Sequence, residues 1–358
     1  MTRYILRRIL VSLPVLFGIV FIVFALARVL PGDPCTAALG ERTDPATCAL
    51  YNARIGLDKP IPEQFAIYLG DIARGDLGTS TKYGRPVTTI LLERLPLTVE
   101  LGFFALTLAI VVGVPLGVVS AMRRNSIIDV ATMMVANLGV SIPVFVLGLL
   151  LAYVFGVILK DTPLALPPSG RLTAGTTVHP LATVWGLQGL GGPPRAILDF
   201  VSNMYTFNAI LTGNLALLGN VLSHLLLPAI ALGTIPLAIV ARITRSSLLD
   251  VLGQDFVRTA RAKGARERRV VLRHGLGNAM LPVVTIIGLQ LGGLLSGAIL
   301  TETIFGLTGV GRTLFEAIQG RDYAVVQAFT LVIAVFYVLI NLLVDVSYGF
   351  LDPRVRVT

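Results

Sequence analysis

The chain has 358 residues, of which 54% are apolar and 14% charged, and it carries a formal net charge of +9. Its mean hydropathy is +0.81. These values exclude an ordinary soluble globular protein. The positive charge lies in short segments between apolar runs, where it reports membrane topology, and no soluble basic face remains to bind nucleic acid.

Six apolar runs are long enough to cross a hydrocarbon core, which takes about 20 residues as a helix. They are Ile9–Ala27, Leu101–Met122, Val130–Leu159, Leu222–Ala241, Ala279–Thr301 and Ala324–Val344. In lipid each run must satisfy its own backbone hydrogen bonds, so each is predicted to be a helix. Prolines at 143, 228 and 236 predict kinks in the third and fourth runs.

Lysine and arginine concentrate in four segments, which precede the first run and follow the second, fourth and sixth. Their basic residues are Arg3, Arg7, Arg8, Arg123, Arg124, Arg242, Arg245, Arg258, Arg261, Lys263, Arg266, Arg268, Arg269, Arg273, Arg354 and Arg356. With six spans all four segments fall on one side, which the positive-inside rule assigns to the cytoplasm. The first run lacks a small-residue cleavage site, so we expect a retained helix and two cytoplasmic termini.

The predicted organisation therefore has four parts. Residues 1–30 form an N-terminal transmembrane helix, and 31–96 form an extracytoplasmic region. Residues 97–350 form a core of five transmembrane helices, with an extracytoplasmic segment at 160–221 and a cytoplasmic loop at 242–278. Residues 351–358 form a cytoplasmic tail.

The first outer region contains both cysteines of the chain, Cys35 and Cys48. A disulfide is permitted outside the cytoplasm, and the alternative is two unpaired thiols in a loop. Apolar residues between 67 and 72 follow one helical face, and 75–78 predicts a turn. Residues 87–96 predict an interfacial helix that ends at the proline before span two. The second outer segment is rich in proline and glycine, and Phe200–Leu218 is too polar and of the wrong parity for a seventh span.

The longest cytoplasmic connector contains a strongly basic stretch with good helix propensity from Phe256 to Lys263. Gly264 suits the left-handed turn at a helix C-terminus. Ala260 and Gly264 are four residues apart, which predicts a helical face nearly bare of side chains, suited to close approach by a partner. The alternative is that the basic residues act only as a topology signal.

This stretch, Arg258-Thr259-Ala260-Arg261-Ala262-Lys263-Gly264, resembles the EAA loop of permeases in the dipeptide/oligopeptide/nickel branch of ABC importers. His274 and Asn278–Pro282 fall where that branch continues its motif, although Gly275 and Gly277 replace the usual Ala and Arg and predict a more flexible exit. Further matches are Pro31–Pro34, Ile55–Pro60, Gly75–Gly78, Glu302–Gly306, Arg321–Tyr323, Asn341–Asp345 and Leu351–Arg354.

The resemblance implies a six-span type I ABC importer permease in the plasma or inner membrane of a prokaryote. It implies a second homologous permease, two ATPase subunits that bind ATP and Mg²⁺, and an extracytoplasmic solute-binding protein. It also implies coupling to the ATPases through Arg258, Thr259, Ala260, Arg261, Ala262, Lys263, Gly264 and Ala265. Short peptides are the expected cargo, and nickel chelates, oligosaccharides or glutathione are the alternatives.

Other constellations are weaker. The sequence Gly306–Thr313 is similar to the phosphate-binding motif G-x-x-x-x-G-K-[ST]. However, Arg312 replaces the lysine of that motif, and no predicted strand precedes the stretch. The three histidines are isolated, and no catalytic or metal-binding pattern is present, which disfavours a membrane-bound enzyme. Asn137, Ser141 and Gln290 lie inside the spans and are candidates to line a translocation pathway. A stand-alone secondary transporter is the alternative, although it predicts charged pairs deep in the spans.

Overall fold

The computed structural model describes residues 2–29, 35, 43–54 and 56–351, and their regular secondary structure is helical, with one isolated bridge between Thr79 and Pro86. The predicted motif at 31–34 and residues 352–358 of the predicted tail lie outside this part of the chain. The long helices are α1 (Thr2–Val29), α5 (Val87–Met122), α11 (Leu215–Leu252), α14 (Gly277–Ile304) and α16 (Tyr323–Leu351).

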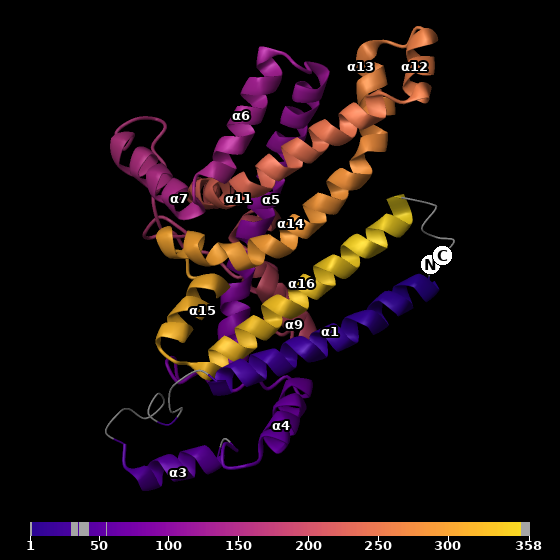
Figure 1. The fold of residues 1–358 in the computed structure, drawn as a ribbon. Helices are drawn as coiled ribbons and strands as arrows, with labels where there is room; N and C mark the ends of the chain where they lie inside the picture. The colour runs from indigo at the N-terminus through magenta and orange to yellow at the C-terminus, as the bar shows by residue number, and fades with distance from the viewer. Residues whose placement is uncertain (1, 30–34, 36–42, 55, 352–358) are drawn as a thin grey trace.

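The shorter elements lie between these helices. They are α3 (Pro45–Arg54), α4 (Ile61–Ala73), α6 (Ile127–Ser141), α7 (Val144–Tyr153), α8 (Leu181–Val184), α9 (Gly192–Ser202), α10 (Tyr205–Leu211), α12 (Asp255–Ala262), α13 (Glu267–Arg269) and α15 (Val310–Gln319). Two π-helical stretches, η1 (Val154–Ile158) and η2 (Val270–Leu276), follow α7 and α13. In Figure 1, α12 and α13 stand at one end of the molecule, and α3 and α4 lie at the other.

The centre of the fold is the packing of α5 against α11. A Cβ atom at Gly113 would lie 2.9 Å from the Leu237 carbonyl oxygen, and one at Gly117 would lie 2.5 Å from that of Ala241. Glycines four residues apart on one helical face let two backbones approach this closely, which is how membrane helices gain packing energy without a hydrophobic driving force. The sequence therefore forms a tight central pair around which the other helices gather.

Helices α1 and α16 lie side by side and antiparallel, so the start of α1 and the end of α16 lie toward the same side of the molecule (Figure 1). The outer helix α4 is attached to α1 by Phe65, whose ring makes edge contacts with Phe17, Phe21 and Phe24. Cys35 and Cys48 form a disulfide in the first outer region, with Cα atoms 5.4 Å apart.

The third predicted span is broken. Helices α6 and α7 are bent by 101° relative to each other, so the described chain holds five helices able to cross a membrane, or six if this pair is one span. Ile142 adopts an extended conformation with φ −93° and ψ 123°, as the residue before a proline prefers, and Pro143 then starts α7. The predicted kink is therefore a full interruption.

A second difference concerns residues 87–96, which were expected to form a separate interfacial helix. They are the first turns of α5, which continues through Pro96 to Met122 without interruption. Val87, Ile90 and Leu91 are buried in a cluster with residues of α15 and α16, including Phe329. This burial holds the outer end of α5 in place.

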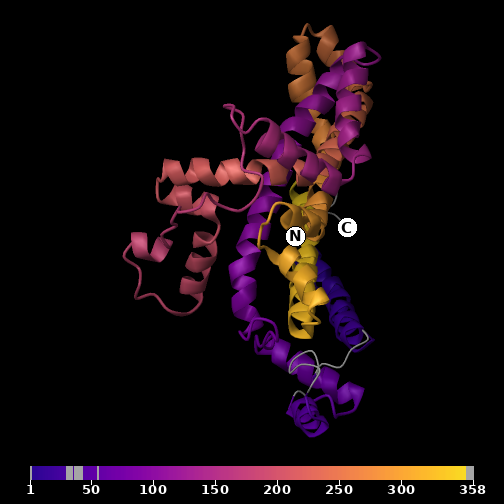
Figure 2. The same ribbon diagram turned by 90° about the vertical axis from the view of Figure 1, so that its left-hand side faces the viewer.

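The second outer segment carries α8, α9 and α10 and projects to one side of the helix bundle (Figure 2). Arg171 anchors it to α5: the guanidinium donates to Glu100 at 2.9 Å and stacks 3.5 Å from the centre of the Tyr205 ring. Gly213 has a φ of +67°, which separates α10 from α11. The stretch 200–218 is thus divided among three helices and does not form a seventh span.

Candidate functional site: the cytoplasmic coupling segment

The predicted coupling segment, defined here as residues 253–276 and called the coupling segment below, connects α11 to α14 and protrudes from the end of the bundle (Figure 1). Gly253 and Gln254 turn the chain after α11, and α12 begins at Asp255. The acidic Asp255 lies in the first turn of α12 and the basic Arg261 in its last, which matches the helix macrodipole at both ends.

Helix α12 ends in a Schellman motif. The N–H of Gly264 donates to the carbonyl of Arg261 at 2.9 Å, and the N–H of Ala265 donates to that of Ala260 at 3.2 Å. Gly264 has a φ of +76°. This conformation is easy for glycine and costs other residues about 1–2 kcal/mol. The predicted role of Gly264 in terminating the helix matches this geometry.

The segment is mounted on a small apolar core. Val257 of α12 and Val270 of η2 are fully buried with Leu248 of α11, in a cluster that also includes Val118 and Ala279. Burial of this kind contributes roughly 1.5–3 kcal/mol for each large aliphatic side chain. The exposed segment is therefore held in a defined position relative to α5, α11 and α14.

The sequence predicted a flexible exit at Gly275 and Gly277, and the structure shows that Gly275 is closely packed. A Cβ atom at Gly275 would lie 2.9 Å from Leu248 Cδ1 and 3.1 Å from Leu252 Cδ2. Gly275 is buried within η2, which leads directly into α14. The glycine allows close packing of the two helices that carry the coupling segment.

The predicted coupling residues divide into two groups. Those exposed are Arg258, Thr259, Arg261, Ala262, Lys263 and Gly264; those half-buried are Ala260 and Ala265. The prediction that Ala260 and Gly264 share one exposed, bare helical face is wrong. Helix α12 ends at Ala262, and Ala260 packs inward against the apolar core. The exposed surface of this segment is instead the outer side of α12 and the turn at Gly264.

An ion pair ties this turn together. Arg261 donates to both carboxylate oxygens of Glu267, at 3.1 Å from Nε and 2.7 Å from Nη2. The hydrogen bonds from Arg261 lower the pKa of Glu267 below its ordinary value. Phe256 and Leu272 are exposed apolar side chains in the same segment and were not predicted as site residues. Their signal was the presence of large apolar residues in a strongly polar loop.

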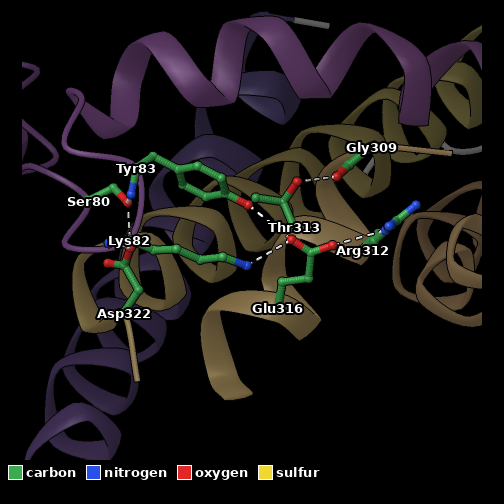
Figure 3. Close-up of polar contacts among 8 residues, drawn as sticks. All are labelled: Ser80, Lys82, Tyr83, Gly309, Arg312, Thr313, Glu316 and Asp322. Atoms are coloured by element: carbon green, nitrogen blue, oxygen red, sulfur yellow. Dashed lines mark hydrogen bonds and ion pairs between the residues drawn. The ribbon is translucent and has the colours of Figure 1, made fainter. Parts of the chain in front are cut away.

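At the other end of the molecule, Figure 3 shows the polar contacts around α15. Glu316 accepts hydrogen bonds from Lys82 Nζ at 2.9 Å, Tyr83 Oη at 3.1 Å and Arg312 Nε at 3.0 Å. The bond from Lys82 is the main cause of a lowered pKa at Glu316. Arg312, which replaces the lysine of a phosphate-binding loop, is therefore engaged with an acidic residue of its own helix.

The glycine-rich stretch preceding α15 is also engaged internally. The N–H of Val310 donates to Thr98 Oγ1 at 2.8 Å, and the N–H of Arg312 donates to Glu302 Oε2 at 2.8 Å. A Cβ atom at Gly309 would lie 2.3 Å from Glu302 Oε1. The glycine makes room for a carboxylate of the same chain, and these backbone donors bind side chains where a nucleotide-binding loop would bind phosphate.

The three pathway candidates lie apart from the coupling segment. Asn137 is exposed and accepts a hydrogen bond from Arg242 at 2.9 Å. Ser141 donates to the Asn137 carbonyl one turn earlier in α6, at 3.1 Å, and Gln290 is half-buried in α14. Within the described residues no group of three His, Cys, Asp or Glu side chains is placed to hold a metal ion.

One charged contact near the coupling segment was not predicted. Asp129 of α6 is buried and forms a two-pronged ion pair with Arg245 of α11, at 2.8 Å for both nitrogen–oxygen contacts. From the sequence, Arg245 was expected only to be a topology signal. An acidic residue beside the start of an apolar run was the available hint, because a charge there needs a partner.

Comparison with known proteins assigns this architecture to a class. Residues 113–357 match the family described as binding-protein-dependent transport system inner membrane component, and residues 1–102 match its N-terminal region. The chain belongs to this family. It is a permease component of an ABC transporter, a multi-pass inner-membrane protein without a catalytic role of its own. The predicted family, all-helical permease fold and cellular location are confirmed.

Individual relatives align over nearly their whole lengths. A dipeptide transport system permease protein of Alkalihalophilus pseudofirmus is 42% identical over 99% of this chain and 100% of its own. The corresponding protein of Escherichia coli K12 is 43% identical over 99% of each chain. A glutathione transport system permease protein of Pectobacterium atrosepticum is 38% identical over 99% of each.

Proposed function

We propose that this chain imports short peptides as one of two homologous permease subunits in an ATP-driven complex. Two ATPase subunits bind ATP and Mg²⁺ on the cytoplasmic side, and an extracytoplasmic binding protein delivers the peptide. The full-length similarity to dipeptide permeases supports this cargo over the glutathione, nickel-chelate and oligosaccharide alternatives. The glutathione permease is also similar to this chain over nearly its whole length. Glutathione is itself a small peptide, so this relative does not contradict a peptide cargo.

The observation that carries the proposal is the exposed but firmly mounted coupling segment. A docking element must present polar and small residues to its partner while transmitting force to the spans. Arg258, Lys263 and the Gly264 turn are exposed, whereas Val257 and Val270 are buried against α11. This arrangement fits a helix that enters a cleft of an ATPase and moves with it.

Among the pathway candidates, Gln290 is the residue for which a role in peptide passage is best supported. The Asn137 side chain already binds Arg242, and the Ser141 hydroxyl is used within its own helix. Gln290 is half-buried in the middle of α14, where a polar side chain is costly unless it faces a partner or water. Peptide selection can then rest mainly with the binding protein.

Co-purification tests the proposed assembly. The tagged chain would be extracted from its own host in mild detergent, and the eluate identified by mass spectrometry. We expect a second permease of the same family and two copies of ATPase, whether from one gene or two. Recovery of the chain alone, together with ATP-independent peptide uptake into liposomes, would replace the importer by a stand-alone transporter.

A further inference from the structure

We propose that Arg245 and Arg242 of α11 link the coupling segment to α6, so that force applied to α12 reaches the broken third span. This linkage, called here the α11–α6 clamp, comprises the Arg245–Asp129 and Arg242–Asn137 contacts. The inference rests on the proposed function, because it needs ATPases that move α12. It assigns a positioning role to two arginines that otherwise read as topology signals.

In the first contact of the clamp, both carboxylate oxygens of Asp129 accept two hydrogen bonds each. Asp129 accepts from Arg245 Nε on one carboxylate oxygen and from Arg245 Nη2 on the other, both at 2.8 Å. The hydroxyl of Ser120 in α5 donates to the same carboxylate, and the N–H of Asn125 donates to it at 2.9 Å. Asp129 is only 4% exposed. Three helices therefore meet on one carboxylate at the cytoplasmic end of the bundle.

The second contact lies farther along α6. Arg242 Nη2 donates to Asn137 Oδ1 at 2.9 Å. Arg242 and Arg245 are three residues apart, so they project from neighbouring positions on one face of α11. Their partners are eight residues apart, which spans about 12 Å of α6 at 1.5 Å per residue. Two contacts separated by this distance prevent α6 from rotating relative to α11. A single contact would act as a pivot and allow that rotation.

The clamp is close to the site where force enters. Arg245 lies on the same unbroken helix as Leu252, and only Gly253 and Gln254 separate that helix from α12. Val257 of α12 is buried against Leu248 of α11, so the two helices are joined by packing as well as by the chain. A displacement of α12 therefore carries the cytoplasmic half of α11 with it.

Movement of α6 affects the break in the third span, which lies at the C-terminal end of α6. Helix α6 ends at Ser141, and α7 departs from it at 101°. Helix α7 packs against α11 and α14, with Gly148 close to the Phe305 ring. Moving α6 with the cytoplasmic half of α11, while α7 stays packed against α14, changes the angle at Ile142 and Pro143. The clamp thus converts a pull on the coupling segment into bending at the interruption of the third span.

Distances between spin labels test the clamp in the purified complex. The chain's two cysteines are joined in a disulfide, so cysteines introduced at Val130, Asp250 and Leu6 can be labelled selectively. All three positions are exposed. Between the nucleotide-free and vanadate-trapped states, the Val130–Asp250 distance should stay constant, because α6 and α11 move together. The Val130–Leu6 distance should change, because α6 moves relative to α1.

Asp129→Asn and Arg245→Lys break the first contact in different ways. The first removes the carboxylate charge, and the second keeps the positive charge but loses the fork geometry. In each, the Val130–Asp250 distance should broaden or shift on trapping, and the Val130–Leu6 change should shrink. Arg242→Gln should give the same effect more weakly. Unchanged distances in a properly assembled Arg245→Lys complex would overturn the clamp.

A second readout separates transmission from mere stability. In proteoliposomes supplied with radiolabelled glycyl-leucine, the ATP hydrolysed per peptide imported should rise about tenfold in Asp129→Asn, within the usual range of coupling between sites. Glu100→Gln is the matched control, since Glu100 is also buried and paired with an arginine but joins α5 to the outer segment. It should leave this ratio unchanged.

The two readouts also separate the clamp from the proposed function. A wild-type complex that imports peptide while the variants keep a normal ratio would contradict the clamp alone. A wild-type complex in which nucleotide changes neither distance would contradict the proposed function, and the clamp would fall with it.

Discussion

At the scale of single residues, Gly264 has two roles: its backbone conformation ends α12, and its exposed position is part of the proposed docking surface. Its φ of +76° closes the Schellman motif at the end of α12. No atom lies within 4 Å of where its Cβ would be, so the space around it is open. A substitution there acts through backbone strain and through the surface it presents, and these two effects can be separated by choosing the new side chain.

We expect Gly264→Asn to keep most ATP-dependent peptide uptake, because asparagine tolerates the left-handed conformation. Gly264→Ala should reduce uptake by up to about tenfold, since strain of ~1–2 kcal/mol opposes the turn. Gly264→Glu should abolish it, because a negative charge is added to the docking surface. Uptake would be measured in cells, with immunoblots to confirm equal amounts in the membrane.

Two outcomes would contradict this reading of Gly264. Equal uptake by the alanine variant and the wild type would mean that the left-handed turn is not needed for coupling. Uptake by the glutamate variant at the level of the asparagine variant would mean that Gly264 does not face the ATPase.

In contrast to Gly264, the disulfide is expected to have no effect on peptide uptake when it is removed. Cys35 and Cys48 are 13 residues apart, so their bond closes a local loop in the outer region. Such a bond restricts the unfolded chain over a short stretch and contributes about 3 kcal/mol at most in the chain-entropy account. Cys35→Ser should therefore leave peptide uptake at the wild-type rate, with Cys48→Ser as its companion variant. Loss of uptake in both variants would show that transport requires this loop to be closed by the disulfide.

At the scale of the elements, local signals predicted some helices well. Helix propensity and a terminal glycine placed α12 within one residue at each end, since its stability depends on residues near in sequence. The break in the third span was predicted only as a kink, because the bend depends on how α7 packs against α11 and α14. Likewise, the continuity of α5 through Pro96 depends on its burial against α15 and α16.

The same distinction applies to the candidate site. The exposed basic residues and Gly264 were accessible from the local sequence. The inward packing of Ala260 and the Asp129–Arg245 pair were not, since 116 residues separate Asp129 from its partner. A pairing over that distance depends on which helix faces meet, and the periodicity of a single run does not determine this.

The close approach of α5 and α11 yields a prediction at this scale. A Cβ atom at Gly117 would lie 2.5 Å from the Ala241 carbonyl oxygen and 2.6 Å from Thr244 Cβ. Gly117→Ala should therefore separate the helices and cost about 1–3 kcal/mol. We expect a lower thermal unfolding temperature in detergent and less protein in the membrane.

Gly102 on the same helix is the matched control. A Cβ atom there would have no neighbour within 4 Å. Alanine also has the higher helix propensity, so Gly102→Ala should unfold at the same temperature as the wild type or above it. Equal unfolding temperatures for the two variants would contradict the close-packed α5–α11 pair.

At the scale of the whole molecule, the two ends of the bundle are built differently. The outer end is fastened by polar contacts within the chain, at Glu316, Glu302 and the Arg171–Glu100 pair. The cytoplasmic end also contains a buried ion pair, Asp129–Arg245, but beyond it a segment protrudes on which Arg258, Lys263 and Gly264 are exposed. This asymmetry fits a subunit that is driven from the cytoplasm.

Peptide uptake by the reconstituted complex tests whether this chain works as part of an ATP-driven importer. The purified complex would be placed in proteoliposomes with its binding protein, radiolabelled glycyl-leucine outside and ATP inside. We expect accumulation that requires ATP and the binding protein and that is lost in Gly264→Glu. Equal accumulation without ATP, or by this chain alone, would contradict it.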